Sequence, residues 1–166
     1  MEAASITLIV SSVTASVSVA TCFIARAQMK IASAKIKLDL YNKRFSIYLT
    51  ALEYYQAALS ENKEDMIFKS VAFIKSYREA LFLFDPKDGV HDTLGRIQQS
   101  GATILSYKKA VSTENWPVMY NKGVISGLND RSNKAYKQFD EELKLLEQQL
   151  AKYIQFKAVS GWGNLG

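Results

Sequence analysis

An uncharged run near the start of the chain limits what this sequence can fold into. From Ala3 to Ala25 there are 23 residues without a charged residue, a glycine or a proline. As a helix the run is about 34 Å long at 1.5 Å per residue, and the hydrocarbon core of a bilayer is about 30 Å thick. The sequence therefore predicts a transmembrane helix at residues 3–25.

The charges beside the run predict its orientation. Only Glu2 precedes it, whereas the stretch from Arg26 to Arg44 holds six cations and one acid, and the rest of the chain is nearly neutral. By the positive-inside rule the N-terminus lies outside and everything from Arg26 onward lies in the cytoplasm. We expect the cations to contact lipid headgroups. They are Arg26, Lys30, Lys35, Lys37, Lys43 and Arg44.

Two alternatives to a membrane span stay open. The stretch from Val13 to Val19 alternates small polar and β-branched residues, a pattern that also suits a strand. A lone strand cannot cross lipid with unpaired backbone groups, and no later segment supplies partner strands. The second alternative is a helix buried in a soluble bundle.

Hydroxyl side chains are frequent in the run and regularly spaced. One row advances by four, three, four and three residues, which places it on a narrow face of a helix; a shorter row, Ser5, Ser12 and Ser16, lies almost opposite. Small hydroxyl residues allow membrane helices to approach closely, so we interpret the longer row as a helix-association face. Bonding of the hydroxyls to their own helix is the alternative. A water-filled pore would be a further step. The row consists of Thr7, Ser11, Thr14, Ser18 and Thr21.

Apolar periodicity predicts an all-α fold, in which the transmembrane helix continues into a cytoplasmic helical bundle at residues 26–157. The first helix should run on from the membrane, with Leu38, Tyr41, Phe45 and Tyr48 facing the core, followed by Leu52, Tyr55 and Leu59. A polar break at residues 60–65, with Asn62 as a cap, precedes a second helix. Its predicted apolar face is Ile67, Val71, Ile74, Tyr77 and Leu81.

The second half of the chain predicts two further helices. Asp85 and Pro86 end the second helix and start a new element. A third helix at about Val90–Val111 carries Leu94, Ile97, Ile104 and Leu105, and a connector or short helix surrounds Pro117. The last helix carries Ala135, Phe139, Leu143, Leu146, Leu150 and Ile154. Residues 158–166 are expected to be a flexible tail.

Residues 35–55 resemble a pattern found in small bacterial single-pass membrane proteins of unknown function. These proteins have one N-terminal apolar helix and then a basic helix with the order Leu-Asp-Leu-Tyr-x-Lys-Arg-Phe-x-x-Tyr. The matching residues are Lys37, Leu38, Asp39, Leu40, Tyr41, Lys43, Arg44, Phe45 and Tyr48. The resemblance covers about the first third of the chain, implies a protein of the bacterial inner membrane, and implies no catalytic residue.

The sequence argues against several function classes. Cys22 is the only cysteine and His91 the only histidine, so a cysteine-based zinc site is excluded and little remains for other transition metals. No phosphate-binding glycine loop is present. We therefore expect no enzyme activity and no cofactor. The basic excess lies beside the apolar run, which disfavours nucleic acid as a partner.

These features predict a membrane-anchored, self-associating helical scaffold or docking protein. Its expected partners are the membrane, further copies of the chain and a soluble cytoplasmic protein. Two alternatives stay open: a membrane-perturbing or pore-forming effector of the toxin or phage-defence type, and a soluble helical interaction protein.

Overall fold

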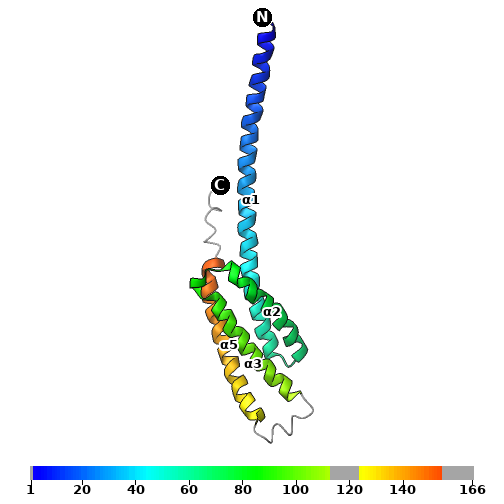
Figure 1. Ribbon diagram of the computed structural model, residues 1–166, viewed down its shortest axis with the longest axis vertical. Coiled ribbons are helices and arrows are strands. Elements are labelled where there is room, and N and C mark those ends of the chain that lie inside the picture. Colours follow the sequence, from blue (N-terminus) through cyan, green and yellow to red (C-terminus); the bar gives the residue numbers. More distant parts are fainter. Residues whose placement is uncertain (1, 113–123, 155–166) are drawn as a thin grey trace. The chain divides into compact units, whose positions relative to one another are not determined.

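The chain folds into helices throughout the part that the structure describes, which confirms the all-α prediction. The computed structural model describes residues 2–112 and 124–154, and the side chains of residues 11–112 and 126–154. Its elements are α1 (Glu2–Leu59), α2 (Lys63–Leu83), the short 3-10 helix η1 (Pro86–Asp88), α3 (Val90–Val111) and α5 (Val124–Ile154) (Figure 1). The chain divides into two compact units, Met1–Leu40 and Tyr41–Gly166.

Helix ends follow the predicted local signals. The Asn62 side chain caps α2 by accepting a hydrogen bond from the Asp65 N–H at 3.0 Å. Asp85 caps η1 in the same way, accepting from the Lys87 N–H, with Pro86 in the first turn. Gly89 then takes a left-handed conformation with φ of 68°, which a glycine adopts without the steric cost of a side chain. These short-range signals set where α2, η1 and α3 begin.

The first unit consists of the N-terminal part of α1. All side chains from residue 11 to residue 39 are exposed. Within the part of the chain whose side chains are described, no helix combines the length and apolar character that crossing a bilayer requires. The predicted run begins at Ala3, and the side chains of residues 3–10 lie outside that part. The transmembrane helix is not confirmed and stays a prediction.

The second unit is a helical bundle with one continuous core, as predicted. Helix α3 packs against α5 and against α2 (Figure 1). Tyr54, at the C-terminal part of α1, is buried at the centre of the core. Its ring stacks on Phe73 of α2 at 5.2 Å between centroids and meets the edge of Phe139 of α5 at 5.4 Å. On α3, Gly101 lies directly against the Tyr54 ring. Four helices therefore meet at one tyrosine.

The core-facing side of α1 differs from the prediction by one residue. Leu38 is exposed and Tyr41 and Phe45 are only partly buried, so the prediction that these three residues face the core is wrong. Tyr48, Leu52 and Tyr55 pack against the core as predicted, although none of them is fully buried. The central face lies about 100° further round, because successive helical residues are separated by that angle. The buried residues on this face are Ile47, Ala51, Tyr54, Ala57 and Ala58.

Small residues and tyrosine hydroxyls explain this shift. Ala51 and Ala58 let neighbouring helices approach α1 closely, whereas a buried tyrosine hydroxyl needs a polar partner. Tyr48 donates to Glu147 at 2.8 Å, and Tyr55 donates to Asp140 at 3.4 Å. Both rings therefore lie at the rim of the core, where their hydroxyls reach charged partners on α5.

The predicted face of α2 is also wrong. Ile67, Val71 and Leu81 are exposed, although Tyr77 packs against the core. The buried residues are Met66, Phe73, Ser76 and Ala80, of which Ser76 and Ala80 are too small to mark a face by hydrophobicity. Large apolar residues consequently remain on the outside of α2.

The predicted faces of α3 and α5 are confirmed. Leu94, Ile97 and Ile104 are fully buried and Leu105 packs against the core; α3 has the predicted bounds. On α5 every predicted position lies in or against the core. The predicted connector around Pro117 and the predicted tail at residues 158–166 lie outside the described residues.

The close contact between Gly101 and Tyr54 gives a stability prediction. A methyl group at residue 101 would overlap the Tyr54 ring, and this ring cannot move because it is held between Phe73 and Phe139. We expect Gly101→Ala to lower the free energy of unfolding by about 1–3 kcal/mol. The usual gain of about 1 kcal/mol from replacing glycine in a helix would not offset it. Urea unfolding followed by circular dichroism measures the change.

Gly127 on α5 provides the matched control, because a methyl group there meets nothing within 4 Å. Gly127→Ala should therefore stabilise the protein by up to about 1 kcal/mol. Equal stability of the two variants would show that Tyr54 is not confined as described.

Candidate functional site

Two hydroxyls of the row on α1 donate to carbonyls of their own helix. Ser18 donates to the Thr14 carbonyl and Thr21 donates to the Val17 carbonyl, each at 2.8 Å. On the opposite side, Ser16 donates to the Ser12 carbonyl at 2.9 Å. The side chain of Thr7 lies outside the described residues. Back-bonded hydroxyls are inexpensive to place beside apolar groups, and their small size still permits close approach of another helix.

Five of the six predicted headgroup-contacting cations are exposed. Arg26, Lys30, Lys35 and Lys37 belong to the first unit, and Lys43 lies at the start of the second. Arg44 differs from them because it is half-buried. The six residues thus have two different environments, although they are close in sequence.

Arg44 contacts the end of α2 and the last turn of α5. Its Nε donates to the Leu83 carbonyl at the end of α2, at 3.0 Å. Its guanidinium lies 4.4 Å from the centre of the Tyr153 ring of α5 and 5.8 Å from the centre of the Phe84 ring. Cation–π contacts of this kind favour a partly desolvated arginine. Arg44 therefore binds the end of α5 to α1, and we leave it out of the proposed headgroup set.

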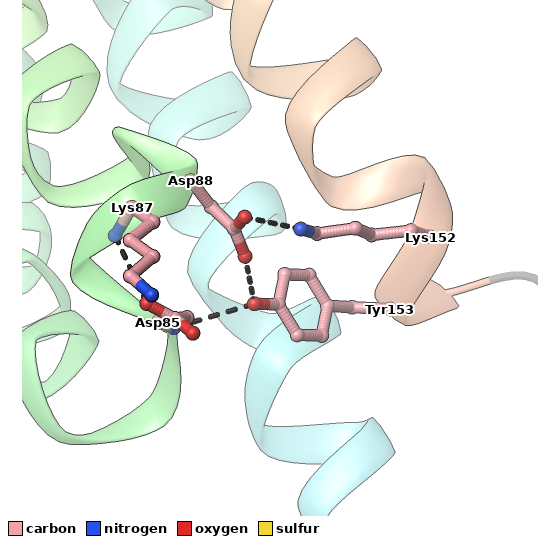
Figure 2. Close-up of polar contacts among 5 residues, drawn as sticks. All are labelled: Asp85, Lys87, Asp88, Lys152 and Tyr153. Atoms are coloured by element: carbon pink, nitrogen blue, oxygen red, sulfur yellow. Dashed lines mark hydrogen bonds and ion pairs between the residues drawn. The ribbon is translucent and has the colours of Figure 1, made fainter.

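A second polar cluster fixes the last turn of α5 to η1. Figure 2 shows Lys152 and Tyr153 donating to the two carboxylate oxygens of Asp88. The Asp85 N–H donates to the Tyr153 hydroxyl at 3.3 Å. The sequence does not predict this cluster, because Asp88 and Lys152 are 64 residues apart and no local pattern connects them.

The electrostatics of the cluster indicate a structural contact. Hydrogen bonds from Lys152 and then Tyr153 lower the pKa of Asp88, and the same contact raises the pKa of Lys152. Burial, followed by the hydrogen bond to Asp88, raises the pKa of Tyr153. These shifts keep Asp88 anionic and the other two groups protonated near neutral pH. Each charged group is matched by a partner, as in a helix-anchoring ion pair.

His91 is held by ring stacking. Its imidazole lies over Tyr77 with centroids 4.5 Å apart and planes inclined by 22°. It lines a surface hollow of about 200 Å³ between the end of α2, η1 and the start of α3. Among the described residues, no group of three or more histidine, cysteine, aspartate or glutamate side chains is arranged to hold a metal ion.

Comparison with protein-family models, with curated proteins and with solved structures finds no match to this chain. The resemblance of residues 35–55 to small bacterial membrane proteins, and the expectation of no enzyme activity, stay predictions. The interaction surfaces that we propose for this chain therefore rest on its own residues alone.

The different environments of Arg44 and its neighbour predict different effects of removing each charge. Arg44→Ala should lower the free energy of unfolding by about 1–3 kcal/mol, because it removes a charged hydrogen bond and a cation–π contact. Lys43→Ala removes the same charge from an exposed position and should leave stability nearly unchanged. Thermal unfolding of both variants checks this. Equal losses of stability in the two variants would mean that removal of the charge, rather than of the contacts of Arg44 with the bundle, causes the loss.

Proposed function

We propose that this protein is a membrane-anchored helical scaffold of the bacterial inner membrane that self-associates through its N-terminal helix and docks a partner on its bundle. In this proposal residues 3–25 cross the membrane and the bundle lies in the cytoplasm. Arg26, Lys30, Lys35, Lys37 and Lys43 contact lipid headgroups. Two features support this proposal: the charge pattern of the sequence and the apolar surfaces that remain exposed on the helices.

The observation that carries the proposal is the exposed apolar surface of α1. Large hydrophobic side chains from Val13 to Leu38 are between 49% and 69% exposed. Burying one such side chain contributes about 1.5–3 kcal/mol, and an isolated helix gains little stability in water. This segment therefore favours an environment that covers it, which lipid and copies of the same helix both supply.

The hydroxyl row supports self-association through its small size. The row consists of short side chains, and two of them, Ser18 and Thr21, donate to carbonyls of their own helix. Another helix can approach such a face closely and gain van der Waals contact. Large apolar residues such as Val13 and Val17 lie beside the row and remain available to lipid.

The outside of α2 supports the docking part of the proposal. Five large hydrophobic residues of this helix are exposed, and Phe82 is 85% exposed. The core of the bundle is closed without them. Exposed apolar residues gathered on one element are typical of a binding surface. They are Ile67, Phe68, Val71, Leu81 and Phe82.

Replacing part of the hydroxyl row tests self-association. We expect Ser11→Leu, Thr14→Leu and Ser18→Leu together to raise the dissociation constant of the oligomer about tenfold or more, since 1.4 kcal/mol corresponds to a factor of ten. Full-length copies carrying donor and acceptor fluorophores, reconstituted in bilayers at graded protein-to-lipid ratios, report the association by energy transfer.

Ser5→Leu, Ser12→Leu and Ser16→Leu form the matched control, because they add the same number of leucines to the almost opposite row. This control should associate as the parent does. Equal energy transfer in all three proteins would refute the hydroxyl face. A membrane-perturbing effector would in addition depolarise expressing cells, and a soluble interaction protein would be released from membranes by alkaline carbonate.

A further inference from the structure

The outer face of α2 has the residue spacing of a helix-pairing surface. From Ile67 the residues on this face advance by four, three, four and three positions, which is the spacing at which two helices interlock their side chains. Val71 is 65% exposed, Leu81 is 53% exposed and Ile74 is partly buried. We call this row the outer stripe of α2. It consists of Ile67, Val71, Ile74, Arg78 and Leu81.

Two phenylalanines widen the outer stripe on one side. Phe68 and Phe82 are two heptads apart, so they lie on the same side of α2, and they are 69% and 85% exposed. In the last turn of the helix, Leu81 also lines the hollow of about 200 Å³ beside His91. This volume is smaller than the range of about 300–1,000 Å³ that is typical of small-molecule sites, and it suits one large apolar side chain. The outer stripe is therefore about 21 Å long and has a socket at one end.

Arg78 is the one charged residue of the outer stripe. Its side chain is exposed, and its guanidinium forms no ion pair or hydrogen bond with another described residue. Lys75, the neighbouring cation on α2, pairs with Glu79 at 4.0 Å. An arginine among apolar side chains loses hydration when another surface covers it, and a carboxylate on that surface offsets the loss. The charge of this face therefore favours a partner with an acidic residue opposite Arg78.

A second copy of α2 does not supply this acidic residue. In an antiparallel pair centred on Ile74, Ile67 faces Leu81 and Val71 faces Arg78, so each guanidinium lies opposite an apolar side chain. In a parallel pair the two copies of Arg78 face each other and repel. The outer stripe therefore fits a helix of a different protein better than it fits itself.

An anionic lipid surface also fits the outer face of α2 less well. Glu64 and Glu79 lie on the exposed side of this helix, with 80% and 47% of their side chains exposed, and they balance the charges of Lys75 and Arg78. A face without net positive charge gains little from anionic headgroups. The regular spacing of the outer stripe favours another helix instead.

We propose that the outer stripe of α2 binds an amphipathic helix of another protein, which carries an acidic residue opposite Arg78 and a large apolar side chain that enters the hollow. Ile74 and Phe82 lie one helical turn from Arg78 on either side and shield the ion pair from water. This binding rests on the docking part of the proposed function, whose partner it specifies.

Two synthetic helices of about three heptads test the role of Arg78. Both have leucine at the heptad core positions, and they differ at one central core position, where one carries glutamate and the other lysine. Fluorescence anisotropy measures their binding to the full chain in lipid discs, with protein-free discs as the blank. We expect the glutamate peptide to bind about tenfold more tightly than the lysine peptide.

Arg78→Glu should reverse this order, so that the lysine peptide binds more tightly. Arg131→Glu is the matched control, because Arg131 is an exposed arginine of α5 and its replacement changes the net charge equally. This control should keep the preference of the parent. An unchanged preference in the Arg78→Glu protein would overturn the proposal. Binding of both peptides no greater than to protein-free discs would also overturn it, since lipid alone would then account for the signal.

Phe82→Ser separates the role of Arg78 from docking on α2 as such. Loss of this exposed ring should weaken the binding of both peptides by a similar factor, about tenfold. If it does so while Arg78→Glu changes neither affinity, α2 docks helices without selecting an acidic residue, and the partner proposed here is wrong although docking stands. Energy transfer between copies of the chain does not involve Arg78, so the result for self-association is independent of this one.

Discussion

The bundle depends on the contact between Tyr54 and Gly101. Tyr54 comes from α1, and its ring touches Phe73 of α2, Gly101 of α3 and Phe139 of α5. A ring of this size fits between four helices only because residue 101 has no side chain. Through this contact α1, α2, α3 and α5 share one core. At the edge of the core, the contacts of Arg44 and Asp88 hold the ends of α2 and α5.

The two units of the chain differ in whether their apolar side chains are buried. Residues of the second unit bury their central apolar face, and their charged groups pair across helices, as between Arg96 and Glu142 at 2.6 Å. In the first unit every described side chain up to residue 39 is exposed, including valine, isoleucine and phenylalanine. The bundle has a closed apolar core, whereas the first unit leaves its described apolar side chains exposed. This difference is why we locate self-association in the first unit and partner docking on the bundle.

The sequence predicted the helices well and their buried faces unevenly. The prediction is correct for faces made of large aliphatic residues, such as Leu94, Ile97 and Leu146, because the large side chains there are also the buried ones. On α1 and α2, small residues such as Ala51, Ala58 and Ser76 share the centre of the contact with Tyr54 and Phe73. Other large residues of these helices, such as Tyr48, Phe68 and Phe82, lie at its rim or outside. Hydrophobic periodicity counts the large residues and therefore points to the wrong side.

The polar contacts of the candidate sites could not be predicted. Arg44 belongs by sequence to a basic segment, and only the fold brings Leu83 and Tyr153 to it. The pairing of Asp88 with Lys152 is equally non-local. Local capping signals at Asn62 and Asp85 were readable because both partners lie within three residues. Non-local pairs require the helix packing to be known first.

We propose that the exposed apolar segment of α1 is covered by lipid and by copies of itself. Native mass spectrometry of the full chain, extracted with its surrounding lipid, tests this most directly. We expect a defined oligomer that retains bound lipid. A lipid-free monomer would contradict it.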